Sequence, residues 1–304
     1  MKIYLNKLSE SWVVDRFRNE WYQYNQKISS KFLTQADIAW IISPWVWKEK
    51  NFKKLKNKKI IYSIYHLEDD FKNKQQISKF NEIDEKINAY HVISLKTKSE
   101  LEKYTDKQIF YAPFWVNQNT FYNIPDKEFL KEKLNIPKDK FLVGSFQRDS
   151  EGSNVMLPKL IKGPDRLVEI YKKLSLERDL HIILSGKRRD YIMNRLSDIK
   201  VPFTYIEMAT FETLNELYNI LDLYIVASRV EGGPQAILEC AVTKTPIIST
   251  DVGIASEVLD KQSIFDMGNF DIATPNIEFA FENSKKFLIP EGFESFIKMF
   301  KSII

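Results

Sequence analysis

Short apolar segments alternate with longer amphipathic segments along the chain, and this alternation constrains the fold more than any other feature. The apolar segments are rich in Ile, Val and Tyr, and they have the length of single buried strands. Strands that alternate with helices predict parallel sheets covered by helices on both faces. The predicted strands form two series: residues 2–5, 37–42, 60–66, 90–94 and 109–112, then residues 141–146, 181–185, 203–206, 223–227 and 246–250.

The segments between the strands have helical spacing in both series. The predicted helices are residues 69–86 and 96–104 in the first series, and residues 165–174, 212–220 and 234–242 in the second. The two series join between residues 113 and 140, where Pro113 and Pro137 interrupt regular structure. The chain is therefore predicted to be α/β, with two Rossmann-like domains over residues 1–137 and 138–285.

Composition and charge narrow the class of protein. Of the 304 residues, 44% are hydrophobic and 28% are charged, which is typical of a globular protein. The net charge of +4 is too small to indicate nucleic-acid binding. The single cysteine, Cys240, cannot form an internal disulfide, and this favours a reducing compartment. No apolar run is long enough to span a bilayer, and no signal peptide is visible, so we expect a cytoplasmic protein.

A lysine-rich segment follows a group of tryptophans. Seven lysines lie between Lys48 and Lys59, and Trp40, Trp45 and Trp47 precede them. Lysines beside tryptophans suit an anionic membrane surface, which would make the protein peripheral at the inner membrane face. The alternative is a solvated helix face, with the tryptophans in the core.

Residues 230–239 combine two carboxylates with a glycine pair, directly after a predicted strand. Gly232 and Gly233 allow a sharp turn, and Pro234 suits the first position of a helix. The free amides of such a helix start favour an anion such as a phosphate. Glu231 and Glu239 suit a ligand with hydroxyl groups, so the segment predicts a sugar-nucleotide site.

This segment resembles the E-x7-E motif of retaining glycosyltransferases with the GT-B fold, of the family 4 (group 1) type. The resemblance covers residues 37–260 and is strongest over residues 141–253. It implies two Rossmann-like domains that face a central cleft. The N-terminal domain would bind the acceptor and the C-terminal domain the nucleotide sugar. It also implies that the final segment, residues 286–304, returns as a helix to the N-terminal domain.

The resemblance carries over to individual donor-binding residues. Arg148 and Lys162 match the positions that hold the donor diphosphate, with Lys159 as an alternative to Lys162. Glu239 would bind the ribose hydroxyls, and Glu231 would orient the donor sugar and act in catalysis. The turn residues Gly232, Gly233, Pro234 and Gln235 would bind donor sugar or phosphate through main-chain amides. Gly186 follows a predicted strand and would face the donor.

His66 ends a predicted strand and matches the family's histidine near the donor sugar, so it is a second catalytic candidate. The cluster Glu68-Asp69-Asp70 could bind a metal, but capping of a helix explains it more simply. The resemblance implies that no metal and no cofactor is needed. The family's glycine-rich loop after the first strand is absent from residues 5–11.

The predicted reaction transfers a sugar from a nucleoside diphosphate, most simply UDP or GDP, to an acceptor hydroxyl with retention. The acceptor would be a glycan or a lipid-linked glycan, in polysaccharide or glycolipid synthesis. Two alternatives stay open at this stage: a related sugar-nucleotide epimerase, and a non-catalytic protein that binds sugar nucleotides.

Overall fold

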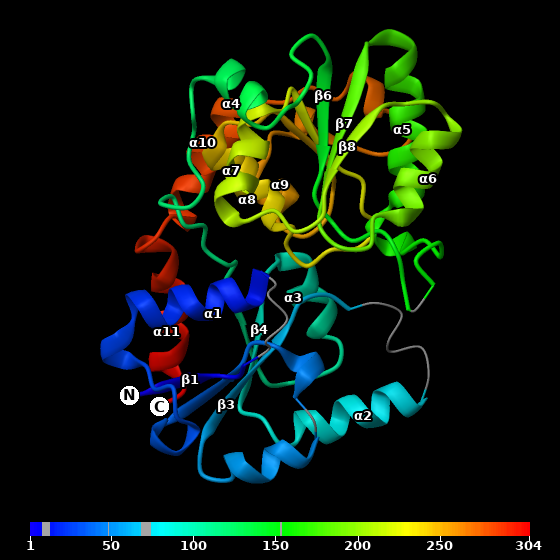
Figure 1. Cartoon of the computed structure of the whole chain (residues 1–304). Helices are drawn as coiled ribbons and strands as arrows, with labels where there is room; N and C mark the ends of the chain where they lie inside the picture. Colours follow the sequence, from blue (N-terminus) through cyan, green and yellow to red (C-terminus); the bar gives the residue numbers. More distant parts are fainter. Residues whose placement is uncertain (8–12, 48, 68–73, 153) are drawn as a thin grey trace. The chain divides into compact units, whose positions relative to one another are not determined.

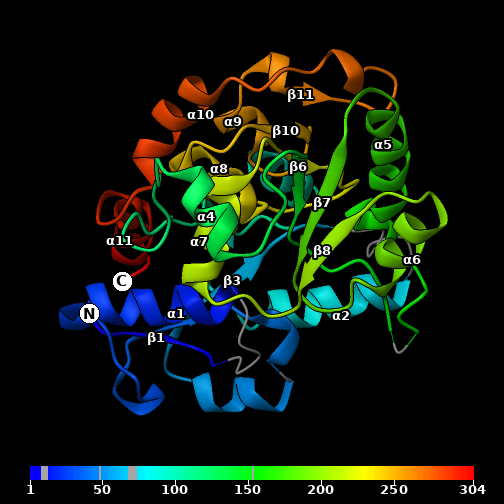
Figure 2. The same cartoon turned by 45° about the horizontal axis from the view of Figure 1, so that its top comes forward.

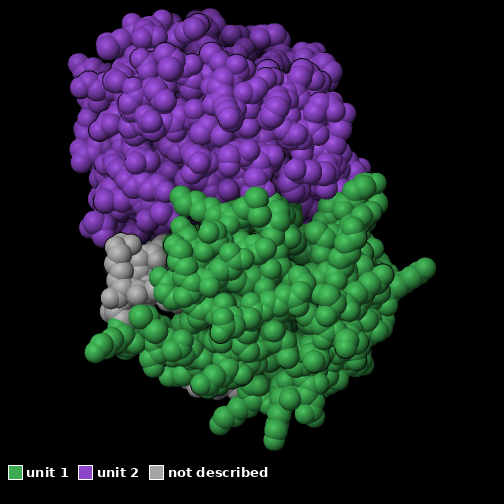
Figure 3. Space-filling model, turned by 180° about the vertical axis from the view of Figure 1, so that it is seen from behind, with its two compact units in different colours: residues 1–114, 290–304 green, residues 115–289 purple. Residues whose placement is uncertain are grey.

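The computed structural model describes residues 1–7, 13–47, 49–67, 74–152 and 154–304. The chain forms two compact units, coloured separately in Figure 3. Unit 1 comprises Met1–Phe114 and Pro290–Ile304, and unit 2 comprises Trp115–Ile289. The boundaries therefore differ from residues 137 and 285. The reason is hydrophobic burial: Val116, Phe121, Leu130 and Phe287 are all buried in the core of unit 2.

Unit 1 contains a five-stranded parallel sheet whose strands lie in chain order (Figure 1). The strands are β1 (Ile3–Leu5), β2 (Ile38–Ile41), β3 (Lys59–Ile64), β4 (Ala89–Val92) and β5 (Gln108–Tyr111). The helices are α1 (Val13–Tyr24), α2 (Lys74–Asp84), α3 (Leu95–Leu101) and the C-terminal α11 (Glu294–Ser302). Helix α1 was not predicted from the sequence. The prediction also extended β3 too far, since His66 lies two residues beyond the end of that strand.

An aromatic core attaches α1 and α11 to the sheet of unit 1. Trp21 of α1 and Trp40 of β2 are fully buried, with ring centroids 5.9 Å apart. Phe296 and Phe300 of α11 lie 5.2 and 5.4 Å from Trp40. Such aromatic contacts bury large apolar areas in preferred edge-on or offset geometries. They give the C-terminal helix a specific seat on unit 1, although it is distant in sequence from the rest of that unit.

His91 belongs to this core and has no exposed surface. Its Nδ1 is 2.8 Å from Ser63 Oγ and its Nε2 is 2.8 Å from the Ala112 carbonyl. Burial lowers the pKa of His91 to about 4, although the hydrogen bond to Ala112 opposes this shift. The histidine is therefore neutral near pH 7 and structural, as its position inside a strand indicates.

Unit 2 contains a six-stranded parallel sheet in the order β11-β10-β9-β6-β7-β8. Its strands are β6 (Phe141–Ser145), β7 (Leu180–Ser185), β8 (Phe203–Ile206), β9 (Leu223–Val226), β10 (Ile247–Thr250) and β11 (Ile264–Phe265). Its helices are α4 (Lys127–Lys133), α5 (Pro164–Glu177), α6 (Asp190–Asp198), α7 (Phe211–Ile220), α8 (Gln235–Thr243), α9 (Ala255–Val258) and α10 (Ile277–Ser284).

Helices cover both faces of this sheet, with α5 and α6 on one side and α7, α8 and α10 on the other (Figure 2). Successive strand residues point to opposite faces, as the pleat requires. In β7, for example, Ile182 and Leu184 pack with the α5–α6 side, whereas Ile183 packs with the α7–α8 side. The continuous apolar runs in the sequence are thus explained by burial on both faces.

The strand order of unit 2 reverses between β6 and β9. From β6 the chain proceeds outward through β7 and β8, and from β9 it proceeds outward through β10 and β11 in the opposite direction. Ligands of open α/β sheets bind beyond the carboxyl ends of the strands at such a reversal. We therefore expect a ligand-binding site at the loops that follow β6 and β9. Among the described residues, no helix has both the length and the apolarity to cross a membrane.

Candidate functional site

The loops after β6 and β9 meet through an ion pair between two residues that the sequence singled out. Lys162 Nζ lies 2.5 Å from Glu231 Oε1. Ser228 Oγ donates a hydrogen bond to the same carboxylate oxygen at 3.2 Å. The Lys162 side chain is 26% exposed and that of Glu231 is 11% exposed, so a ligand can reach the pair. Lys159, the alternative cation, lies three residues earlier and forms no ion pair with a described carboxylate, so Lys162 is the one of the two that contacts Glu231.

Gly163 allows the two loops to approach this closely. It has φ +64°, and a Cβ at this position would lie 2.0 Å from the Ala227 carbonyl oxygen. Only glycine combines that backbone conformation with that contact. Gly163 ends the 3-10 segment Leu160–Lys162, and Pro164 then begins α5. The Lys162 side chain is thus held against the end of β9.

The glycine pair packs against a third loop, which follows β10. Gly253 has φ +56°, and a Cβ there would lie 2.6 Å from the Gly232 carbonyl oxygen. Helix α8 begins at Gln235, with Pro234 as its N-cap, so the proline precedes the helix by one residue rather than opening it. The turn and the first amides of α8 therefore lie beside Glu231, as the sequence pattern requires.

Glu239 lies on α8 and is only 5% exposed. Tyr218 of α7 donates a hydrogen bond from its hydroxyl to Glu239 Oε2 at 2.8 Å. Burial, followed by the nearby Glu239 carboxylate, raises the pKa of Tyr218 well above its ordinary value, so the tyrosine remains a proton donor. The Phe146 and Tyr224 rings pack on Tyr218, at 5.0 and 5.5 Å between centroids.

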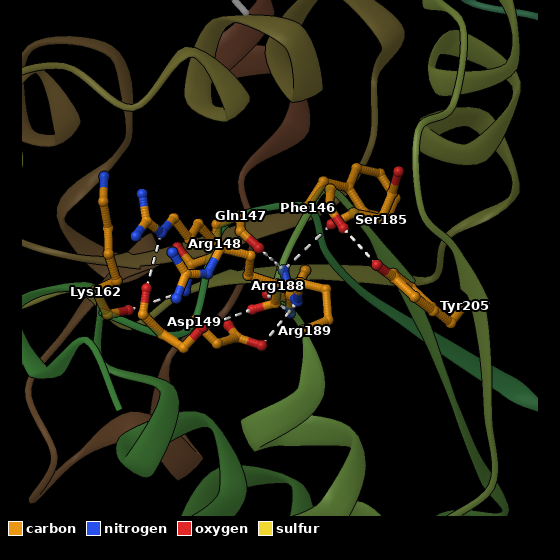
Figure 4. A network of polar contacts seen from close by, with 12 residues as sticks. Phe146, Gln147, Arg148, Asp149, Lys162, Ser185, Arg188, Arg189 and Tyr205 are labelled. Atoms are coloured by element: carbon orange, nitrogen blue, oxygen red, sulfur yellow. Dashed lines mark hydrogen bonds and ion pairs between the residues drawn. The ribbon is translucent and has the colours of Figure 1, made fainter. Parts of the chain in front are cut away.

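Arg148 is half-buried in the loop after β6, and its Nε donates to the Ser150 carbonyl at 2.7 Å (Figure 4). It forms no ion pair with any carboxylate that the structure describes. Gly186 follows β7 with φ +97°, and its amide donates to the Glu207 carbonyl at 3.0 Å. Tyr205 donates to the Gly186 carbonyl at 3.0 Å. Both predicted residues therefore lie at the carboxyl edge of the sheet.

Several residues around the site were not predicted from the sequence. They are Gln147, which donates to the Lys162 carbonyl at 2.9 Å, together with Ser228, Tyr218, Asp149 and Arg189. Ser228, Gln147 and Asp149 lie within four residues of a strand end, which is a usable signal for site residues in a parallel sheet. Tyr218 lies inside a helix and carries no such signal.

Other predicted residues belong to unit 1 or lie outside the described residues. His66 lies in unit 1, half-buried beyond β3, and its catalytic role stays a prediction. The cluster Glu68-Asp69-Asp70 lies outside the described residues. Within the described ranges, no group of three or more His, Cys, Asp or Glu side chains could hold a metal ion.

The strand order and the site at its reversal define a Rossmann-like α/β protein, and comparison with known proteins specifies its class. Residues 126–287, just over half of the chain, match the family model described as glycosyl transferases group 1. The chain therefore belongs to the group 1 glycosyltransferase family, and its fold is GT-B. A comparison with curated proteins finds no match to the sequence.

Solved structures support the same fold at low sequence identity. HepE from Anabaena, in complex with UDP and glucose, superposes with a TM-score of 0.74 at 12% identity, over 99% of this chain and 100% of that one. Sucrose-phosphate synthase from Thermosynechococcus elongatus gives 0.69 at 15%, over 95% and 77%. A glycosyltransferase from Rickettsia africae gives 0.65 at 18%, over 98% and 83%.

We expect Gly163→Ala to destabilise unit 2 by about 3 kcal/mol, from the left-handed backbone and the overlap with Ala227, or about 10 °C in unfolding temperature. Gly152→Ala is the matched control, because Gly152 has φ +54° but a Cβ there meets no described atom within 4 Å. The control should cost only about 1 kcal/mol, the backbone part alone. Differential scanning calorimetry measures both, and equal losses would contradict the close approach.

Proposed function

We propose that this glycosyltransferase transfers a sugar from a nucleoside-diphosphate sugar to an acceptor hydroxyl with retention at the anomeric carbon. The contact between Lys162 and Glu231 at the reversal of the sheet carries the proposal. It joins a cation that suits a phosphate to a carboxylate that suits sugar hydroxyls, at the edge where parallel sheets bind ligands.

The departing nucleoside diphosphate gains negative charge as the glycosidic bond breaks. Arg148 and Lys162 would stabilise that charge, and fixed cations act more strongly on the transition state than on the ground state. The ion pair with Glu231 keeps Lys162 in place before the donor arrives. We propose that these two side chains neutralise the diphosphate without a metal ion.

Glu231 would orient the hydroxyls of the donor sugar and stabilise positive charge at its anomeric carbon. Glu239 would accept hydrogen bonds from the ribose hydroxyls, with its carboxylate oriented by Tyr218. The amides of Gly232, Gly233 and Gln235 would bind sugar or phosphate at the start of α8, where the helix dipole favours an anion.

The neighbouring structures suggest which donors to test first. HepE is described in complexes with UDP and with UDP-glucose, and TarM from S. aureus in a complex that includes UDP and alpha-GlcNAc-glycerol. We therefore propose a UDP-sugar as the first donor class and a glycan or lipid-linked glycan as the acceptor, with GDP-sugars as the second donor class.

UDP should raise the unfolding temperature of the chain, because a ligand that binds only the folded state stabilises it. In Arg148→Ala the affinity for UDP should fall by about 10- to 100-fold, the usual loss for one charge-assisted hydrogen bond. Isothermal titration calorimetry measures the affinity. Arg195→Gln, which removes an exposed ion pair on α6, is the control and should bind as the wild type.

Each alternative function predicts a different outcome in the same experiments. A shift with GDP and none with UDP would change the donor class only. Conversion of the donor sugar without an acceptor would identify an epimerase, and binding without any product would identify a non-catalytic protein. No shift with any nucleoside diphosphate would refute the donor-binding proposal.

Glu231→Gln should lower turnover by about 100-fold or more and change the affinity for UDP by less than about tenfold, since the carboxylate is assigned to the sugar and acts on the nucleotide only through its ion pair with Lys162. Steady-state kinetics with donor and acceptor, together with titration of UDP, separates the two effects. An equal loss of turnover and UDP affinity would move Glu231 to the nucleotide, and unchanged turnover would exclude it from the reaction.

We also propose that the lysine-rich segment contacts an anionic membrane surface. Phe52 and Leu55 are buried, whereas Lys53, Lys54 and Lys56 point into solvent. The three tryptophans before the lysines differ in exposure: Trp40 is in the core, Trp47 is half-buried, and Trp45 is 53% exposed. An exposed tryptophan eight residues before the first of these solvated lysines suits binding to head groups.

Sedimentation with vesicles tests this contact. The chain should bind vesicles that contain acidic lipids at low salt, and replacement of Lys53, Lys54 and Lys56 by serine should weaken binding by about 3 kcal/mol in sum, since each lysine near an acidic surface contributes about 1 kcal/mol. Neutral vesicles are the control. Absence of binding at low salt would leave the segment as a solvated surface.

A further inference from the structure

We propose that the buried ion pair between Arg189 and Asp149 positions Arg148 for the donor diphosphate. This inference rests on the proposed function, because it assumes that Arg148 binds the diphosphate. It assigns two positioning residues that touch no substrate themselves.

The pair lies beneath the carboxyl ends of β6 and β7, at the start of α6 (Figure 4). Arg189 Nε is 2.8 Å from Asp149 Oδ2, and both side chains have no exposed surface. The guanidinium also donates to the carbonyls of Gln147 and Ser185, and to Ser145 Oγ at 3.1 Å. One side chain thus joins the ends of two strands to the loop that carries Arg148.

These contacts bracket Arg148 in the sequence. Its predecessor Gln147 is held through its carbonyl, and its successor Asp149 is held through its side chain, both by Arg189. The main chain of Arg148 is therefore fixed on both sides. The direction in which its guanidinium leaves the loop depends on these two anchors and on the Ser150 carbonyl, which accepts from its Nε.

A second layer of contacts joins the same two loops. Arg188 has φ +64°, an unusual conformation for a residue other than glycine. Its carbonyl accepts from the Asp149 amide at 3.3 Å and from Ser150 Oγ at 3.4 Å. Its guanidinium donates to the carbonyls of Glu151 and Gly152. The turn after β7 and the loop after β6 thus behave as one body.

Stability alone gives little reason to bury two charges here. A buried ion pair costs much of its attraction in desolvation, and apolar residues of similar volume often stabilise a fold equally well. Arginine offers what an apolar residue cannot, which is a rigid fork of donors that reaches several acceptors at once. That property serves to hold the carbonyl of Gln147 and the carboxylate of Asp149 in fixed positions.

A double-mutant cycle tests the inference. The pair is replaced by apolar residues in Asp149→Leu with Arg189→Met, and Arg148→Ala is made in both backgrounds. We expect the apolar pair to weaken UDP binding by about tenfold. Arg148→Ala should then cost about 30-fold in the wild-type background but less than threefold in the apolar background, because residues that act through one another are not additive.

Arg189→Lys supplies a second route if the apolar pair fails to fold, since lysine keeps the positive charge beside Asp149 but lacks the fork of donors. It should also raise the KM for the donor with a smaller change in kcat. Arg195→Gln on the same helix is the control and should leave UDP affinity unchanged. The unfolding temperature of every variant separates a loss of fold from a loss of position.

The pH dependence of donor binding is an independent readout. Burial raises the pKa of Asp149 to about 6, although Arg189 opposes the shift. The groups that face Asp149 are Asp190 and Arg189 at the start of α6, Tyr171 on α5 and Tyr205 on β8. Affinity for UDP-glucose should fall in the wild type as pH decreases through about 6, because protonation removes the carboxylate charge. Asp149→Asn should lack this transition.

The outcomes separate the two proposals. The positioning role would be overturned if Arg148→Ala reduced UDP affinity by the same factor in both backgrounds, or if the pair variants bound UDP as tightly as the wild type. Either result would leave the donor site intact. If the wild type binds no nucleoside diphosphate, the proposed function fails and the inference falls with it.

Discussion

The reversal of strand order between β6 and β9 is the constraint on which the site depends. Each strand ends at the same edge of the sheet, so the loops that follow these two strands must share one space. Gly163 then sets the distance between them, because only a residue without a Cβ can lie against the Ala227 carbonyl. Lys162 and Glu231, 69 residues apart, meet as a consequence.

Charge is arranged differently at three levels of this edge. Arg189 and Asp149 are fully buried and paired. Lys162 and Glu231 are paired but reachable from solvent. Arg148 is half-buried and has no described carboxylate partner. This gradient is what a phosphate site requires, since buried charges must be compensated within the protein, whereas the outermost cation can be compensated by the ligand.

The strands of both sheets except β11 could be predicted from the sequence, because apolar periodicity reports burial directly, whereas the helices α4, α6, α9 and α10 were not predicted. Both parallel sheets follow from it, and so does the placement of the site at strand ends. The prediction failed where local sequence signals conflict with tertiary contacts. Helix α1 carries Arg16 and Glu20 as buried residues, which masks its apolar face. Residues 115–137 were predicted to belong to the first domain, yet Val116 and Leu130 pack in the core of unit 2.

The sequence alone determined the class of fold and most of the donor-site candidates, because a glycine pair and two glutamates at a strand-to-helix turn carry their chemistry locally. Only the tertiary structure decided which cation faces Glu231, what orients Glu239, and what supports Arg148. Lys162 was distinguished from Lys159 by its ion pair with Glu231. Tyr218 and Arg189 are joined to their partners across 21 and 40 residues, and no local pattern encodes such pairings. They arise where the sheet brings strand ends and helices together.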